Sequence, residues 1–156
     1  DSMGNKGRTA AGDVQVMSAG TGVRHAEYNL EDEATTLFQI WIEPDRSGGA
    51  PGWGAKQFPK SDRTGQWSVL ASGKDDDGAL KIRADARVLG ATLDAEQELA
   101  YTPDPARHIY LTLATGVVEV NGVRLNARDG VAITAEPNIV IKAIEGPAEI
   151  VVTDTL

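Results

Sequence analysis

The chain of 156 residues has no cysteine and only two histidines, His25 and His108. The lack of cysteine excludes disulfide scaffolds, cysteine-bound zinc, iron–sulfur clusters and thiol catalysis. Two histidines are too few for an all-histidine metal site within one chain. No apolar run approaches the roughly 20 residues of a membrane-spanning helix, and no charged-then-apolar signal segment opens the chain. We therefore expect no membrane association and a cytoplasmic location.

Positive charge is also scarce. The 15 Lys and Arg residues stand against 23 Asp and Glu residues, which gives a net charge of -8. Direct binding of nucleic acid through a broad basic surface is therefore not expected. Hydrophobic residues make up 41% of the chain, enough for the core of one ordinary domain or two very small ones.

The sequence does contain many short apolar runs, and no window keeps a long helical period. Turn residues such as Gly48-Gly49 and Asn121-Gly122 separate the runs, which predicts an all-β fold of the sandwich or barrel type. The clearest hairpin is 118–125, where Asn121-Gly122 between β-branched residues favours a two-residue type I′ turn. The expected strands are Val14–Met17, Leu37–Ile42, Trp67–Leu70, Ala86–Leu89, His108–Leu113, Val117–Val120, Val131–Ile133, Ile139–Ile144 and Ile150–Val152.

The stretch 44–63 differs in composition, with three prolines, four glycines and the aromatic residues Trp53 and Phe58. It is too rich in Gly and Pro to be one strand, and we predict an interdomain connection that its aromatic residues anchor to a surface. The chain is thereby divided into an N-terminal part, 1–43, and a C-terminal part, 64–156. The three tryptophans, Trp41, Trp53 and Trp67, are expected to anchor the core and this connection.

A weak internal repeat relates the two parts. Residues 11–16 (Ala-Gly-Asp-Val-Gln-Val) resemble residues 127–133 (Ala-Arg-Asp-Gly-Val-Ala-Ile), and each is a tight acidic turn that leads into a strand. Many residues of further strands precede the second copy, whereas only ten residues precede the first. If the parts are homologous, the first lacks its front half. The chain also begins with Asp1 rather than Met, so we expect a fragment of a longer protein.

The segment Gly12–Asn29 has the most informative spacing. Gly12 is followed by seven residues, Gly20-Thr21-Gly22, two residues, His25, three residues and Asn29. This spacing resembles the second conserved motif of the cupin superfamily, G-x(5–7)-P-x-G-x2-H-x3-N, with Gly20 in the proline position. We interpret Gly20-Thr21-Gly22 as a tight turn that presents His25.

Further stretches narrow the resemblance to the pirin family of bicupin proteins. These stretches are residues 1–5, 12–27, 37–42 and 116–122. The resemblance implies an all-β fold of two cupin jelly-roll barrels, with a complete C-terminal cupin and a partial N-terminal cupin in this chain. It also implies a metal-dependent dioxygenase activity of the quercetin 2,3-dioxygenase type, in which dioxygen opens a metal-bound flavonol and carbon monoxide is released.

The resemblance also implies a metal site. Pirins hold their metal with three His and one Glu, two of the His in a P-H-P-H segment and the last pair as H-x-E. His25 and Glu27 match that last pair and are the implied metal ligands, and Glu27 is the implied catalytic base toward a flavonol hydroxyl. Because residues i and i+2 of a strand share a face, we expect His25 and Glu27 to lie on the same face of a strand. The implied cofactor is a divalent transition metal, iron first, with Mn, Co, Ni, Cu or Zn as alternatives.

Other residues suggest no second site. The P-H-P-H segment does not occur in this chain, so we expect metal binding and catalysis to be impaired. In the C-terminal part, His108 has no partner histidine, and apolar residues 139–141 stand where the second motif would place one. We assign this part a structural role and His108 a surface or satisfied core position. Asp75-Asp76-Asp77 lacks the spacing of a calcium loop and is predicted to be a solvated turn.

Three hypotheses of function stay open. The first is a dioxygenase acting on a flavonol-like small molecule. The second is a non-enzymatic, metal-tuned regulator that binds a protein partner, which the acidic charge favours over DNA. The third is an inactive fragment, because loss of front strands exposes apolar faces and strand edges. Such exposure predicts a homodimer, with strand exchange as one form of it. On spacing alone, His25 and Glu27 also fit a polar exposed pair.

Overall fold

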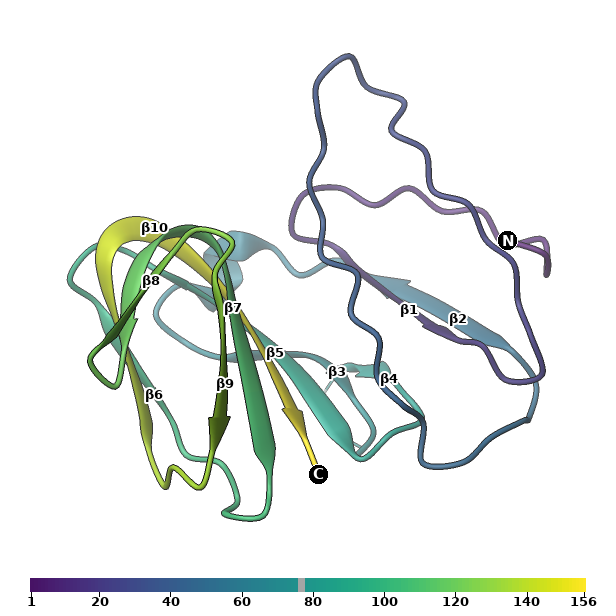
Figure 1. Ribbon diagram of the computed structural model, residues 1–156. Coiled ribbons are helices and arrows are strands. Elements are labelled where there is room, and N and C mark those ends of the chain that lie inside the picture. The colour runs from purple at the N-terminus through teal and green to yellow at the C-terminus, as the bar shows by residue number, and fades with distance from the viewer. Residues whose placement is uncertain (76–77) are drawn as a thin grey trace.

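The computed structural model of the chain describes residues 1–75 and 78–156 (Figure 1). Asp76 and Asp77 of the expected acidic turn lie outside the described residues, and Asp75 forms an ion pair with Lys81. No helix in these two ranges is long and apolar enough to cross a membrane. The elements are β1 (Val14–Ser18), β2 (Gly52–Lys56), the short 3-10 helix η1 (Lys60–Arg63), β3 (Ser68–Ser72), β4 (Leu80–Lys81), β5 (Ala86–Leu93), β6 (Glu98–Tyr101), β7 (His108–Val120), β8 (Val123–Asn126), β9 (Gly130–Thr134) and β10 (Ile139–Thr155).

The long strands β7 and β10 belong to both layers of the C-terminal part and close it into a barrel. Residues 139–142 of β10 lie between β6 and the end of β7, whereas residues 148–155 lie between β5 and the start of β7. β8 pairs with the end of β7, and β9 pairs with its start. Figure 1 shows β10 curving over one end of this barrel. Two sheets that share long bent strands are typical of jelly rolls, as the sequence predicts.

The bend of β7 occurs at Gly116. This residue has a φ of +82°, and a Cβ there would lie 2.5 Å from the carbonyl oxygen of Glu145. β10 is irregular at the same level, with register shifts between Ala143 and Ile150. Because only glycine tolerates both this φ and this approach of the backbone, Gly116 allows the two strands to bend together.

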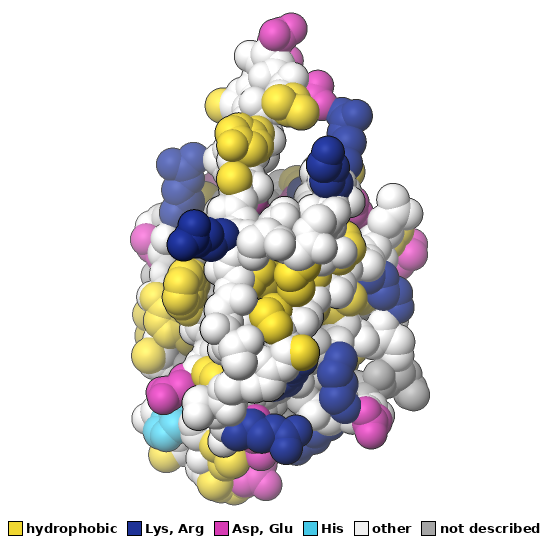
Figure 2. Space-filling model, turned by 90° about the vertical axis from the view of Figure 1, so that its right-hand side faces the viewer, with side chains coloured by type: hydrophobic (Ala, Val, Ile, Leu, Met, Phe, Trp, Pro, Cys, Tyr) yellow, Lys and Arg dark blue, Asp and Glu magenta, His cyan; other side chains and the backbone are white. Residues whose placement is uncertain are grey.

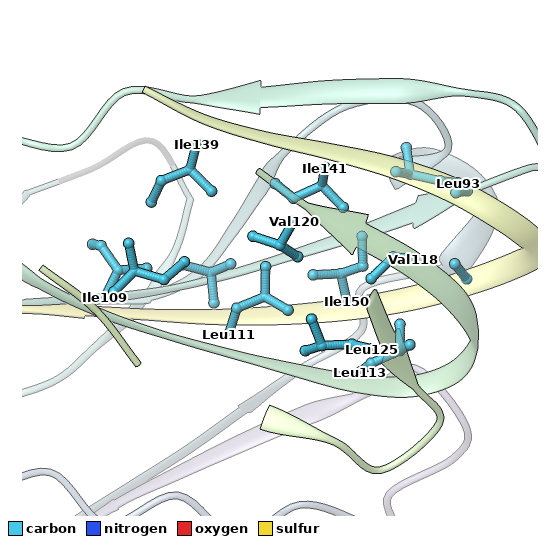
Figure 3. Packing of buried hydrophobic residues seen from close by; sticks show 14 of the residues in the cluster. Leu93, Ile109, Leu111, Leu113, Val118, Val120, Leu125, Ile139, Ile141 and Ile150 are labelled. Carbon is cyan, nitrogen blue, oxygen red and sulfur yellow. The ribbon is translucent and has the colours of Figure 1, made fainter. Parts of the chain in front are cut away.

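The interior of the barrel is filled with aliphatic side chains (Figure 3). Alternate residues of β7 point inward, and Leu111 and Leu113 are both 0% exposed. Ile139 and Ile141 of β10 lie in the same cluster, so the place where a second-motif histidine would stand is part of the core. The structural role assigned to the C-terminal part stays a prediction. The buried members are Leu89, Leu93, Ile109, Leu111, Leu113, Val118, Val120, Leu125, Ile133, Ile139, Ile141, Ala143, Ala148, Ile150 and Val152.

A buried ionic network lies where β5 and β7 begin and β10 ends. Arg107 donates through Nε to Asp154 and through Nη1 to Asp85 at 2.9 Å, and the Tyr101 hydroxyl donates to the second carboxylate oxygen of Asp154. Arg107 is 9% exposed and Asp154 is 3% exposed, so the pair compensates charges that burial would otherwise penalise. Burial, followed by the hydrogen bond to Asp154, raises the pKa of Tyr101 well above its usual value.

β1 of the N-terminal part forms an antiparallel pair with β2, which lies in the connection 44–63. Val14 and Val16 pack on a second cluster, whose buried members are Phe58, Leu70, Ala71 and Val88. Phe58 thus anchors the connection, as predicted. β2 itself was not predicted, because its Gly and Ala residues resemble a linker. The strand forms nevertheless, because all five of its residues pair with β1, from Gly52 opposite Ser18 to Lys56 opposite Val14.

Two expectations for the N-terminal part are wrong. Residues 37–42 form no strand, because a strand needs a hydrogen-bonded neighbour and no described segment pairs with them. Trp41 is 86% exposed and anchors nothing. Of this run, Ile42 reaches the second cluster.

Candidate metal site

β1 begins after a turn closed by Asp13. The Asp13 carboxylate accepts from the amide of Ala10 at 2.9 Å, and the Asp13 amide donates to the carbonyl of Ala10 at 3.0 Å. Asp129 makes the same two bonds with Asn126, at 2.8 and 2.9 Å. The repeat that is weak in the sequence is therefore a repeat of hydrogen-bonded structure.

The two faces of β1 carry different side chains. Val14 and Val16 pack toward the C-terminal barrel, so the exposed side chain of Gln15 between them lies on the other face. There, the Nε2 of Gln15 donates a hydrogen bond to Oε1 of Glu27. This bond ties one predicted ligand to a strand.

The turn that precedes the predicted ligands has the expected form. The Gly22 amide donates to the carbonyl of Ala19 at 2.8 Å, and the Thr21 amide donates to the carbonyl of Gly49 at 2.9 Å. Gly20 has a φ of +54°, and a Cβ there would lie only 2.4 Å from the Gly49 oxygen. Gly20 is therefore required by both conformation and space.

His25 and Glu27 follow this turn in an exposed segment, 19–51, to which no helix or strand is assigned. The expectation that they share a strand face is thus not met. Two hydrogen bonds nevertheless hold the backbone before His25. The Ser2 backbone amide donates to the Arg24 carbonyl at 2.7 Å, and the Arg24 amide donates to the Ser2 hydroxyl at 3.0 Å.

The chemistry of the two side chains fits a divalent transition metal. They offer an imidazole nitrogen and a carboxylate oxygen, which Fe(II), Mn(II) and Ni(II) accept as ligands. The number of donors is smaller than a closed site needs, because no group of three or more His, Cys, Asp or Glu residues gathers in the described ranges. His25 and Glu27 would therefore hold a metal together with ligands from water or from residues outside this chain.

The remaining histidine takes no part in this arrangement. His108 opens β7, where it is exposed and pairs through its backbone with Thr134 and Thr155. This agrees with the predicted surface position. Sequence reasoning missed Gln15, although a polar residue between two valines of a strand was an available signal.

Two protein-family models match the chain, pirin over residues 1–42 and the quercetinase C-terminal cupin domain over residues 69–155. A pirin-like protein of Caulobacter vibrioides is 63% identical over 155 residues, and the quercetin 2,3-dioxygenase of Escherichia coli K12 is 35% identical over 155 residues. Both alignments cover 99% of this chain, but 66% and 65% of those proteins. The chain thus spans slightly less than two thirds of the length of these relatives.

Solved structures agree with this result. The bacterial pirin YhhW of Escherichia coli, in complex with nickel(II), superposes with a TM-score of 0.87 at 32% identity, over 98% of this chain and 65% of that one. A quercetin 2,3-dioxygenase of Acinetobacter baumannii superposes with a TM-score of 0.68 at 18% identity, over 99% of this chain and 59% of that one, which supports the fold alone. The expected cupin fold is confirmed.

Proposed function

Because this chain belongs to the pirin family of cupin proteins, we propose that it forms part of a metal-dependent dioxygenase of the quercetin 2,3-dioxygenase type. One observation carries the proposal. The match to the Escherichia coli quercetin 2,3-dioxygenase covers 99% of the chain, including its one His-x-Glu sequence, His25 to Glu27. The substrate class proposed is a flavonol-like small molecule.

In this proposal, His25 and Glu27 are two of the ligands of a divalent metal. Such a metal, when bound, polarises a substrate oxygen as a Lewis acid. The carboxylate of Glu27 takes the proton of the flavonol hydroxyl. The turn at Gly20 and the two bonds between Ser2 and Arg24 hold the backbone before His25, and the C-terminal barrel is the scaffold. One relative has been solved in complex with nickel(II), and iron is the metal that the sequence resemblance favours.

The test compares two histidine variants. Elemental mass spectrometry should find about one metal per chain after loading with Fe(II), Mn(II), Co(II) or Ni(II), and His25→Ala should lose it. His108→Ala is the matched control and should keep it. Quercetin turnover, followed as carbon monoxide release, is measured on a form extended to the length of the relatives. A folded and metal-loaded form without turnover would contradict the dioxygenase proposal.

We also propose that a second copy of the chain covers the exposed apolar side chains of residues 28–41, giving a homodimer. Tyr28 is 80% exposed, Leu30 89% and Trp41 86%. Figure 2 shows hydrophobic side chains gathered on the face of the molecule that β1 and β2 occupy. The run 37–42 has strand composition and no strand partner within residues 1–75 and 78–156, so the same run of another copy could pair with it. Sedimentation velocity that finds a monomer at micromolar concentration would refute this.

A further inference from the structure

We propose that Gln15 is a positioning residue, whose side-chain amide holds the Glu27 carboxylate ready for the metal. This inference rests on the proposed function, which makes Glu27 a ligand. Its first support is the hydrogen bond from Nε2 of Gln15 to Oε1 of Glu27. Hydrogen bonds from neighbouring side chains orient ligating carboxylates and strengthen metal binding. With Oε1 held by the amide, Oε2 is the oxygen left to bind a cation.

The second support is the rigidity of Gln15 compared with Glu27. The Gln15 backbone pairs with Ala55 of β2, and its neighbours Val14 and Val16 are packed on the second cluster. Glu27 lies in the segment without helix or strand. Within the described residues, Gln15 is the one side chain that bonds to the Glu27 carboxylate. The hydrogen bond from the Gln15 amide therefore restricts the movement of the Glu27 side chain by linking it to a packed strand.

The third support comes from the internal repeat. When Asp13 is aligned with Asp129, Gln15 corresponds to Val131. Val131 packs against the cluster inside the C-terminal barrel. The position is thus directed to the barrel interior in the complete cupin, and the N-terminal copy has a hydrogen-bond donor at that place instead of an aliphatic side chain.

The fourth support is that the donor is neutral. Glu31 and Glu149, in contrast, form ion pairs with an arginine and a lysine. A cationic partner would offset the negative charge that attracts a metal, whereas an amide orients the carboxylate and leaves that charge in place. The neutral amide partner of Glu27 therefore suits a metal ligand better than the cationic partners of Glu31 and Glu149 do.

The test is a Ni(II) titration of the 156-residue chain, followed by line broadening of the NMR signals of residues 24–28. Gln15→Met keeps the length of the side chain and removes the donor. We expect it to weaken Ni(II) binding by about 10-fold or more without changing the melting temperature. Gln66→Met is the matched control, because Gln66 also donates from Nε2, to the Asp62 carbonyl at 2.8 Å. It should leave the affinity unchanged.

A double-mutant cycle separates positioning from other effects. In the background of Glu27→Ala, Gln15→Met should cause no further loss of Ni(II) affinity, and an equal further loss would overturn the inference. A readout without metal is the hydrogen exchange of the Gln15 side-chain amide, which should be slow in the parent chain and fast in Glu27→Ala. Equal rates in both would also overturn it.

The same titration distinguishes this inference from the proposed function. If His25→Ala and Glu27→Ala weaken Ni(II) binding but Gln15→Met does not, the ligands stand and the role of Gln15 is refuted. If the parent chain shows no broadening at residues 24–28, or if neither ligand variant changes the affinity, the ligand assignment fails and the role of Gln15 fails with it.

Discussion

β1 and β9 start with the same hydrogen-bonded turn, at Asp13 and at Asp129, but they belong to regions that are built differently. β9 completes a barrel whose interior is filled with aliphatic side chains, and its Ile133 is 9% exposed. β1 pairs with β2 alone in the described residues and presents Gln15 to an exposed segment. The same turn thus starts a core-forming strand in one region and a strand that carries a polar donor in the other.

The difference lies in the side chains at alternating positions rather than in the backbone. Aligned from the aspartates, Gln15 and Met17 correspond to Val131 and Ile133. In the C-terminal copy both residues pack in the barrel cluster. Aliphatic side chains at these positions stabilise the barrel, whereas the exposed amide of Gln15 at the corresponding position of β1 can hold a ligand side chain.

The largest difference in stability between the two regions should appear when one leucine in each is shortened to alanine. Leu111 of β7 is 0% exposed and Leu30 is 89% exposed. Leu111→Ala leaves a cavity in the barrel, and we expect it to lower the free energy of unfolding by about 2–5 kcal/mol. Leu30→Ala should change it by less than about 0.5 kcal/mol. Urea denaturation measures both, and similar losses would show that the exposed segment is packed in solution.

A smaller change in the free energy of unfolding should come from the residue that precedes the aspartate in each of the two turns. Gly12 has a φ of +90°, and a Cβ there would lie 3.1 Å from the Phe58 carbonyl oxygen. Gly12→Ala should therefore lower the free energy of unfolding by about 1–2 kcal/mol. Arg128, at the equivalent place, has a φ of +76°. Arg128→Gly should relieve this conformation and raise stability by about 0.5 kcal/mol. A loss of stability in Arg128→Gly would show that the arginine side chain makes a compensating contact.

Within the barrel, a modest effect at neutral pH should come from the buried network of Tyr101, Arg107 and Asp154. Tyr101→Phe removes the hydroxyl that donates to Asp154, which should reduce stability by about 1 kcal/mol. Burial and the hydrogen bond to Asp154 raise the pKa of Tyr101 in the folded chain above its ordinary value of 10.0, so the unfolded chain loses this proton first as pH rises. The stability contributed by Tyr101 is therefore present below pH 10 and declines above it.

Thermal unfolding between pH 8 and about 11 measures this decline. Tyr101→Phe should show a shallower alkaline loss of stability than the parent chain. Tyr28→Phe, which changes an 80% exposed tyrosine of the N-terminal part, is the matched control and should behave as the parent does. A Tyr101→Phe curve that is parallel to the parent curve would contradict the role of the hydroxyl.

Local signals in the sequence were enough for much of the fold. The hairpin at Asn121-Gly122 is confirmed, with φ values of +46° and +82° and Val120 opposite Val123. β7 and β10 were each predicted as two strands, because Gly116 in β7 and Gly146-Pro147 in β10 resemble breaks. In the structure they are bends within continuous strands, since neighbouring strands pair on both sides of them.

The site was predicted only as far as its motif extends. The spacing from Gly12 to Asn29 indicated His25 and the pirin resemblance implied Glu27, and both assignments stay predictions. The hydrogen bond from Gln15 depends on how residues 12 positions apart fold together. Arg107 and Asp154 are 47 residues apart, and no local pattern relates them. The run 37–42 has the composition of a strand, but strand formation depends on a partner that its own sequence cannot provide.

β10 has a consequence for the order of events during synthesis. It lies between β7 on one side and β5 and β6 on the other, and it is translated after all three. A nascent chain that has emerged only as far as β9 therefore exposes the apolar faces of strands whose common neighbour has not been made. The barrel can close only after residues 139–155 have left the ribosome, so protection from aggregation matters most just before that moment.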